Sequence, residues 1–167
     1  MPLPTISEGE IRSLFPEVTS AEPIDHGGQK VVFRANYKGQ PIALKFALLS
    51  ARFTPENEDA EETGLRAARE TQIMRDCTSP HIVKLGPIAL GTGRVSGQNL
   101  LFFSEEFVDG RSLDKVLRNE GRLTANEVMR LGLQMCSAIS DLWSLGTIHR
   151  DIKAGNIMRK NDGRGYA

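Results

Sequence analysis

The sequence predicts an α+β fold in which strands dominate the first part of the chain and helices the second. Residues 31–37 and 41–46 are rich in β-branched and aromatic residues and flank a short Gly-containing turn, which is typical of a β-hairpin. Residues 100–108 have a similar composition, and a helical pattern at 65–74 is inserted between them. After Gly110 the apolar residues recur at helical spacing. We therefore expect a sheet with one inserted helix, followed by a helical part.

The composition is that of one ordinary globular domain. Of 167 residues, 40% are apolar and 25% are charged, and 21 Lys and Arg balance 21 Asp and Glu. A chain without net charge has no overall field that attracts nucleic acid or an anionic membrane, so neither is expected as a partner. No run approaches the roughly 18 apolar residues of a membrane-spanning helix, and the N-terminus does not resemble a secretory signal. Cys77 and Cys136 are expected to be reduced thiols, which indicates a cytoplasmic location.

Weaker patterns surround these elements. Residues 6–15 have slight helical periodicity, which ends at Pro16. Residues 54–64 are acidic and are expected to form a solvated loop or the start of a helix. Residues 82–85 resemble a strand, whereas the polar, Gly-rich residues 91–99 are expected to form a hairpin loop.

The second part is expected to contain two helices and a loop. Residues 113–117 form a short amphipathic segment, and Thr124 with Glu127 makes a capping box at the start of a longer helix. Gly146 is expected to end that helix. Six apolar residues recur along it at helical spacing: Val128, Leu131, Met135, Ile139, Leu142 and Trp143.

Three polar residues follow this helix within a short stretch. Asp151 can accept a hydroxyl proton, Lys153 can neutralise phosphate charge, and Asn156 offers an amide oxygen for Mg²⁺. Phosphoryl transfer needs these parts, because it depends largely on positioning and charge neutralisation. The alternative is a polar loop with a capping Asp and a surface Lys. The complete run 149–156, placed after a capped helix, favours the catalytic interpretation.

The run 149–156, His-Arg-Asp-Ile-Lys-Ala-Gly-Asn, resembles the catalytic loop of the protein kinase family. The resemblance implies that Asp151 orients and deprotonates the substrate hydroxyl, that Lys153 contacts the transferred phosphate, and that Asn156 binds Mg²⁺. A Lys two residues after the Asp is the pattern of serine/threonine kinases. The implied cofactors are ATP and Mg²⁺, and the implied partner is a protein substrate with a Ser or Thr hydroxyl.

The resemblance covers roughly residues 24–160 and implies a protein-kinase-like fold. Such a fold has a β-rich N-lobe with an αC helix, followed here by the first part of the helical C-lobe, namely αD, αE and the catalytic loop. We expect residues 1–20 to form an N-terminal extension, residues 21–108 the N-lobe and hinge, and residues 109–167 a partial C-lobe.

A lysine in the first part supports the same interpretation. Ala43-Leu44-Lys45 resembles the family's Ala-x-Lys, in which the Lys holds the α- and β-phosphates of ATP. The alternative for Lys45 alone is an exposed strand lysine. A phosphate-binding Lys needs a carboxylate partner, and Glu70 on the inserted helix is the best candidate. Glu61 and Glu62 are weaker candidates, because they lie in the acidic stretch.

The Gly-rich loop of the family falls on residues 25–30, where only Gly27 matches the pattern. Gly28 beside it lets the backbone approach phosphates closely. Asp25 replaces the first glycine and brings a negative charge near the polyphosphate, which Lys30 can offset. A plain β-turn is the alternative for this segment.

The resemblance also assigns the adenine pocket. Glu106 and Val108 fall in the hinge, where backbone groups pair with adenine. Glu105 falls where the family usually has a bulky apolar residue, so either the register slips by one or the pocket is polar. Apolar residues complete the pocket and would fit a core equally well: Ile24 at its mouth, Val32 and Ala43 as its roof, and Met158 as its floor.

The family's Asp-Phe-Gly motif, whose Asp binds a second Mg²⁺, does not occur in the sequence. We therefore expect a truncated kinase domain that is inactive by itself, with part of the apolar face of the 124–145 helix uncovered. Asn156 is a neutral ligand, and Asp162 is interpreted as a turn residue. The alternative is a catalytically inactive, kinase-derived module that binds nucleotide or protein.

Overall fold

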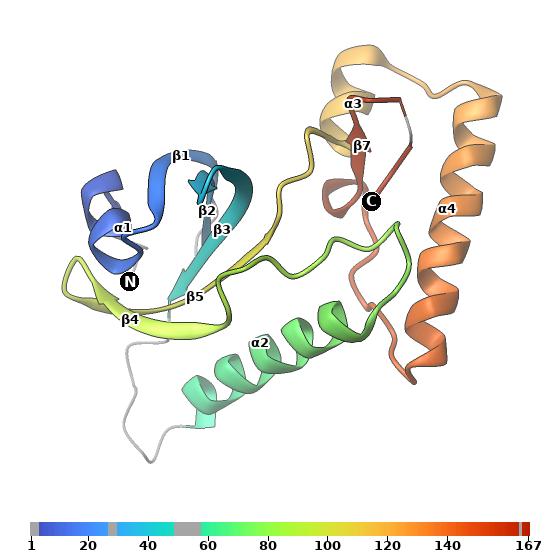
Figure 1. The fold of residues 1–167 in the computed structure, drawn as a ribbon. Coiled ribbons are helices and arrows are strands. Elements are labelled where there is room, and N and C mark those ends of the chain that lie inside the picture. The colour runs from blue at the N-terminus through green and yellow to red at the C-terminus, as the bar shows by residue number, and fades with distance from the viewer. Residues whose placement is uncertain (1–3, 27–29, 49–57, 164) are drawn as a thin grey trace. The chain divides into compact units, whose positions relative to one another are not determined.

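The computed structural model describes residues 4–26, 30–48, 58–163 and 165–167. It confirms the α+β fold: strands build the first part of the chain, and helices dominate the second (Figure 1). The chain divides into two compact units. The first comprises Met1–Gln72 and Leu85–Phe107, and the second comprises Ile73–Lys84 and Val108–Ala167.

The first unit contains a five-stranded sheet of order β1-β2-β3-β5-β4, in which all neighbours are antiparallel. The expected hairpin is confirmed as β2 and β3, which turn at Lys38 and Gly39, both with positive φ. The strands are β1 (Val18–His26), β2 (Lys30–Tyr37), β3 (Gln40–Leu48), β4 (Gly91–Val95) and β5 (Gln98–Glu106).

Two predictions at the edge of this sheet were wrong. Residues 91–95 are not part of a loop, because they pair with β5 along their whole length as strand β4. Only Ser96 and Gly97, both with positive φ, make the turn. Residues 82–85 do not form a strand; Leu85 makes a single bridge to Glu105.

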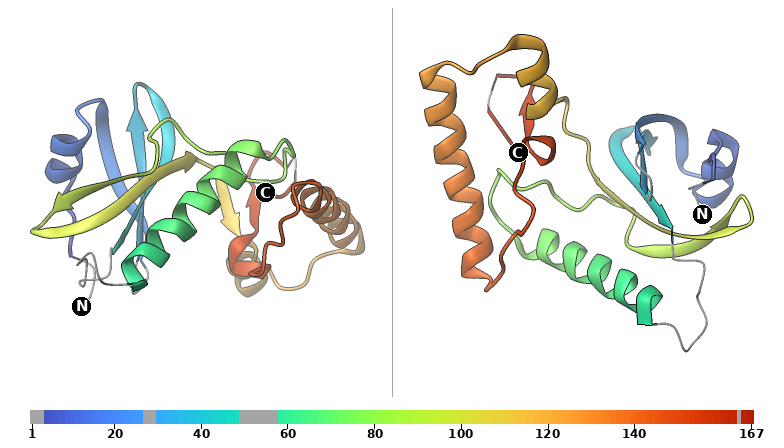
Figure 2. Two further views of the ribbon diagram at one scale, coloured as in Figure 1. Left: turned by 90° about the horizontal axis from the view of Figure 1, so that it is seen from below. Right: turned by 180° about the vertical axis from the view of Figure 1, so that it is seen from behind.

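Helix α1 (Glu8–Leu14) packs on one face of the sheet, as the two views in Figure 2 show. A capping box between Ser7 and Glu10 begins it, which satisfies otherwise free backbone N–H groups. Ile11 on its inner side is fully buried. The same core contains Phe46, whose ring lies 5.9 Å from that of Phe33 and 6.3 Å from that of Phe102. The N-terminal segment is therefore part of the core of the first unit.

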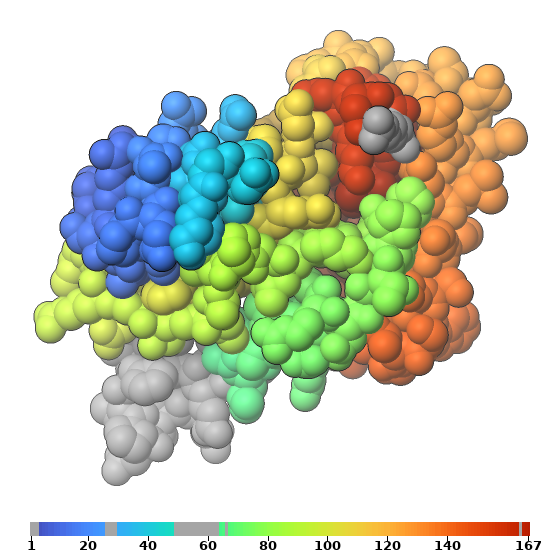
Figure 3. All heavy atoms as spheres, in the orientation of Figure 1, coloured from blue at the N-terminus to red at the C-terminus, as the bar shows by residue number. Residues whose placement is uncertain are grey.

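Glu10 also ties α1 to the β4–β5 turn, and the two segments are visible side by side in Figure 3. Its carboxylate accepts hydrogen bonds from Ser96 Oγ, from the Ser96 backbone N–H at 3.0 Å and from the Ser7 backbone N–H at 2.9 Å. The Ser96 hydroxyl, followed by the Ser7 N–H, lowers the pKa of Glu10 to about 2.

This carboxylate makes the stability of the protein depend on pH. Because the pKa of Glu10 is lower in the folded state, its contribution is complete above the ordinary value of 4.5 and is lost as the pH falls toward about 2. We expect Glu10→Gln to lower the midpoint of thermal unfolding at pH 7. The difference in midpoint between this variant and the parent protein should disappear as the pH falls from 4.5 to 2. Glu22→Gln, on exposed β1, is the control. A gap that stays constant over this range would contradict the assignment.

Helix α2 (Glu58–Asp76) is the expected inserted helix, and it begins within the acidic stretch. Residues 54–57 of that stretch lie outside the described residues. Ala67, Thr71 and Met74 form its buried side, whereas Glu70 is exposed. Spacings of three and four residues place the buried side chains on one face of the helix.

The second unit contains α3 (Leu113–Glu120), α4 (Ala125–Ser144) and a two-stranded sheet of β6 (Gly110–Ser112) and β7 (Met158–Lys160). The capping box of Thr124 and Glu127 is confirmed, and α4 ends at Ser144, with Leu145 as its C-cap before Gly146, which has a φ of 66°. None of the described helices has the length and apolarity needed to cross a membrane.

The apolar stripe of α4 is only partly covered. Leu142 is buried, but Val128, Ile139 and Trp143 are exposed, with 75% of Trp143 accessible to solvent. The core of this unit consists of Leu113, Val116 and Tyr166, and Leu131 and Met135 of α4 pack against it. Part of the apolar face of this helix is therefore open to solvent, as expected.

Candidate active site

Asp151, Lys153 and Asn156 meet in one cluster in the second unit. Lys153 Nζ donates to Asp151 Oδ2 at 2.8 Å, and Asn156 Nδ2 donates to the same oxygen at 2.8 Å. Asn156 Nδ2 also donates to the backbone oxygen of Asp151 at 2.9 Å. The three side chains singled out from the sequence therefore share one hydrogen-bond network at the protein surface.

The local backbone explains how residues so close in sequence converge. Arg150 has a φ of 63°, the left-handed region that non-Gly residues rarely adopt, and this reverses the chain before Asp151. A 3₁₀ turn at Ala154–Asn156 then brings the amide of Asn156 back toward Asp151. Strain of this kind is common at functional sites.

The network keeps Asp151 ionised. The hydrogen bond from Lys153, followed by that from Asn156, lowers the pKa of Asp151 below its ordinary value. An ionised carboxylate is a hydrogen-bond acceptor only, so it can orient a hydroxyl group and take its proton.

The donor set is compatible with a Mg²⁺ ion held jointly with a ligand. In the parts of the chain that the structure describes, no three His, Cys, Asp or Glu side chains cluster as a complete metal site. Asn156 uses its amide nitrogen to bind Asp151, which leaves its oxygen as the ligand atom. Mg²⁺ in nucleotide enzymes usually takes few protein ligands and completes its shell with phosphate and water.

Lys45 on β3 has a different partner from the one expected. Its ammonium group forms an ion pair with Glu105 on β5 and lies 5.5 Å from the centre of the Phe103 ring. The expected partner, Glu70, is exposed on α2. The interpretation of Lys45 as an exposed strand lysine is not supported, because its side chain is only 24% exposed.

The other expected nucleotide-binding residues are divided between the two units. Val32 and Ala43 are buried in the sheet, Ile24 is 45% exposed on β1, and Glu106 ends β5. Val108 and Met158 are half-buried in the second unit. Gly27 and Gly28 lie outside the described residues.

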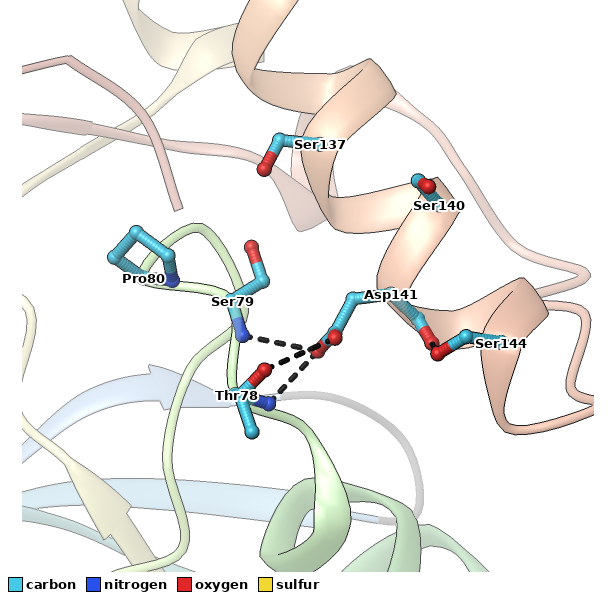
Figure 4. A pocket seen from close by; sticks show the side chains of 7 residues that line it. All are labelled: Thr78, Ser79, Pro80, Ser137, Ser140, Asp141 and Ser144. Carbon is cyan, nitrogen blue, oxygen red and sulfur yellow. Dashed lines mark hydrogen bonds between the residues drawn. The ribbon is translucent and has the colours of Figure 1, made fainter.

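Asp141 makes a further polar cluster that the sequence did not indicate. Its carboxylate accepts from the backbone N–H groups of Thr78 at 2.7 Å and Ser79 at 2.9 Å, beside a pocket of about 380 Å³ (Figure 4). These bonds lower the pKa of Asp141, the Ser79 N–H contributing most. Asp141 thereby fixes the chain that follows α2 against α4. A polar residue on an amphipathic helix gave no signal of this pairing.

A family model described as protein kinase domain matches residues 19–164. The chain belongs to the protein kinase family. Helix α1 lies outside the matched region, although it packs into the same core as the matched strands.

Curated relatives of this kinase domain are serine/threonine kinases. The chain is 27% identical over 159 residues to the serine/threonine-protein kinase PknH of Mycobacterium tuberculosis, covering 95% of this chain and 24% of that protein. It is 30% identical over 142 residues to the serine/threonine-protein kinase pkn3 of Myxococcus xanthus, covering 83% and 24%. The chain thus spans about a quarter of the length of these relatives.

The kinase fold is also supported by a solved structure. Rad53 1–466 in complex with AMP-PNP superposes with a TM-score of 0.70 at 22% identity, covering 92% of this chain and 39% of that one. This likeness concerns the fold, and it agrees with a β-rich N-lobe followed by helices.

The register of this kinase-family sheet bears on the unusual Glu105. Strands β3 and β5 pair without interruption from Ile42 and Glu106 to Leu48 and Leu100. Glu105 is buried, with its carboxylate on Lys45.

Proposed function

We propose that the protein transfers the γ-phosphoryl group of ATP to Ser or Thr hydroxyls of protein substrates, in the presence of Mg²⁺. The observation that carries this proposal is the cluster of Asp151, Lys153 and Asn156, which unites a base, a cation and an oxygen ligand. Family membership and the serine/threonine kinases among its relatives support it.

In the proposed reaction Asp151 accepts the hydrogen bond of the substrate hydroxyl and takes its proton as the oxygen attacks phosphorus. Lys153, which is bound to Asp151, would neutralise charge on the transferred group. Asp151, whose pKa lies below its ordinary value, is ionised at neutral pH. In this proposal Asp151 takes the proton and Lys153 neutralises the phosphate charge in the same step.

The proposed nucleotide contacts of the first unit lie on its sheet. Lys45 would bind the α- and β-phosphates, with Val32 and Ala43 against the adenine. Mg²⁺, when bound, neutralises the phosphate charge that develops during transfer. Asn156 is the residue proposed to hold it.

Transfer of radioactive phosphate from ATP to Ser/Thr and Tyr peptides by the whole protein, with MgCl₂ present, tests the proposal. We expect labelled Ser and Thr, no labelled Tyr, and a loss of about 10²-fold in kcat/KM with Lys45→Met, because one preorganised cationic donor is removed. Lys115→Met, on exposed α3, is the matched control and should retain the parent rate. Transfer that is unaffected by Lys45→Met would contradict the assignment.

A nucleotide-binding module without transfer is the second candidate. The oxygen that Asn156 offers is neutral, whereas Mg²⁺ in proteins is usually bound through one or two carboxylates, and this favours the second candidate. Binding of ATP by the chain, measured by calorimetry, without transfer to any peptide would support this candidate against the enzyme.

A further inference from the structure

We propose that Glu105 is the residue that positions Lys45, in place of the carboxylate on the inserted helix. The proposal rests on the proposed function in one respect, namely that Lys45 binds the nucleotide phosphates. Glu105 itself has no assigned role in this reaction, and it acts through Lys45 rather than on the substrate.

The strand register brings the two side chains together. In the β3–β5 pairing Lys45 lies opposite Phe103, and Ala43 lies opposite Glu105. Lys45 and Glu105 are therefore diagonal neighbours on the same face of the sheet, within reach of long side chains. The methyl group of Ala43 is small, which leaves space above it for the carboxylate to turn toward Lys45.

Burial makes this ion pair more than a surface contact. The side chain of Glu105 is 10% exposed and that of Lys45 is 24% exposed. A carboxylate removed from water is costly unless an opposite charge or hydrogen bonds compensate it, and Lys45 supplies both. We therefore expect the ion pair to stay closed unless another charged group takes the place of one partner.

Apolar neighbours further restrict the position of the Lys45 ammonium group. Val32 on β2 and Phe103 on β5 are the two strand neighbours of Lys45, so apolar side chains flank it on both sides. The ring of Phe103 is within cation–π distance of Nζ. Lys45 therefore has few alternative rotamers, and its direction is set by the sheet.

Glu70 provides the comparison. It lies on α2 beside the buried Ala67, Thr71 and Met74, but it is itself exposed.

A Lys ammonium group has three N–H donors, so a bond to Glu105 leaves two for phosphate oxygens. Glu105 thus supplies the orienting carboxylate without using all the donors that the nucleotide needs.

The test measures how fast the amine of Lys45 is acylated, which requires no kinase activity. An amine-reactive acylating reagent is applied in brief pulses at pH 8 to the full chain, and each lysine is quantified by mass spectrometry. An amine that a buried carboxylate holds inside the sheet reaches the reagent less often than a free amine. We expect Glu105→Gln to raise the acylation rate of Lys45 about tenfold relative to Lys153, which is the internal reference, because a hydrogen bond to a charged group is worth about that factor.

Glu70→Gln and Glu22→Gln are the comparison variants. Both should leave the Lys45 rate within about twofold of the parent, because neither carboxylate is bound to Lys45. An increase with Glu70→Gln that equals or exceeds the increase with Glu105→Gln would overturn the proposal, and so would no increase with Glu105→Gln.

A second measurement on the parent protein covers the case in which Glu105→Gln does not fold. A zero-length carbodiimide cross-link joins an amine to a carboxylate that it contacts. We expect a link between Lys45 and Glu105, which lie 60 residues apart in sequence. A link from Lys45 to Glu70, or no link from Lys45, would count against the proposal. Whether ATP and Mg²⁺ protect Lys45 from acylation tests the proposed function separately, because the ion pair can form even if Lys45 does not bind the nucleotide.

Discussion

Asp151→Asn is expected to lower kcat for phosphoryl transfer by about 10³-fold, the largest effect that we predict for any single change in this protein. The substitution keeps the size of the side chain and one oxygen, but it removes the group that accepts the proton. General base catalysis typically contributes between about 10² and 10⁴. Initial rates with a Ser/Thr peptide and saturating ATP measure the effect.

The control is Asp162→Asn, a similar change in an exposed turn of the same unit. It should retain the parent rate, because the hydrogen bonds that hold Asp151 come from Lys153 and Asn156. The KM for ATP should change little in Asp151→Asn, since Asp151 is assigned to the hydroxyl substrate. Undiminished transfer by Asp151→Asn would remove Asp151 from the mechanism, and equal losses in both variants would indicate a general disturbance of the loop.

Phe46→Ala is expected to lower the free energy of unfolding by about 3–5 kcal/mol. The ring of Phe46 is fully buried between the sheet and the N-terminal segment, with Phe33, Phe15 and Phe102 around it. Truncation to Ala removes the buried ring and leaves a cavity that a sheet cannot easily close. Urea unfolding monitored by circular dichroism gives the difference.

Leu65→Ala is the matched comparison, because Leu65 is 61% exposed on α2. Its effect should stay within about 0.5 kcal/mol, as for most surface substitutions. A loss below about 1 kcal/mol for Phe46→Ala would show that the core of the first unit is not organised around this ring.

The elements that sequence predicted well are those with local causes. The β2–β3 hairpin turns within a few residues, and the capping box of α4 needs only Thr124 and Glu127. Strand β4 was missed because its composition is that of a loop, with two glycines in five residues, and only pairing with β5 makes it a strand. The role of α1 in the core was equally hidden, because a short weak pattern does not reveal which surface will cover it.

The same distinction between local and long-range causes applies to the candidate site. The cluster around Asp151 was predictable, because its members lie within six residues and one tight turn brings them together. The partner of Lys45 was not predictable, since it depends on the register of two strands far apart in the chain. Glu105 was conspicuous as a charge at an apolar position, but only the pairing of Ala43 with Glu105 explains where its carboxylate goes.

The strand order also determines when the site can form as the chain folds. Strands β1, β2 and β3 are sequential and can pair early, through short-range contacts. Strand β5 joins β3 only after the chain between Leu48 and Gln98 has closed into a loop, which costs entropy before any contact is gained. We therefore expect Lys45 to enter its strand before Glu105 pairs with it. We expect substitutions at the β3–β5 seam to slow folding more than equally destabilising substitutions in the β2–β3 hairpin turn.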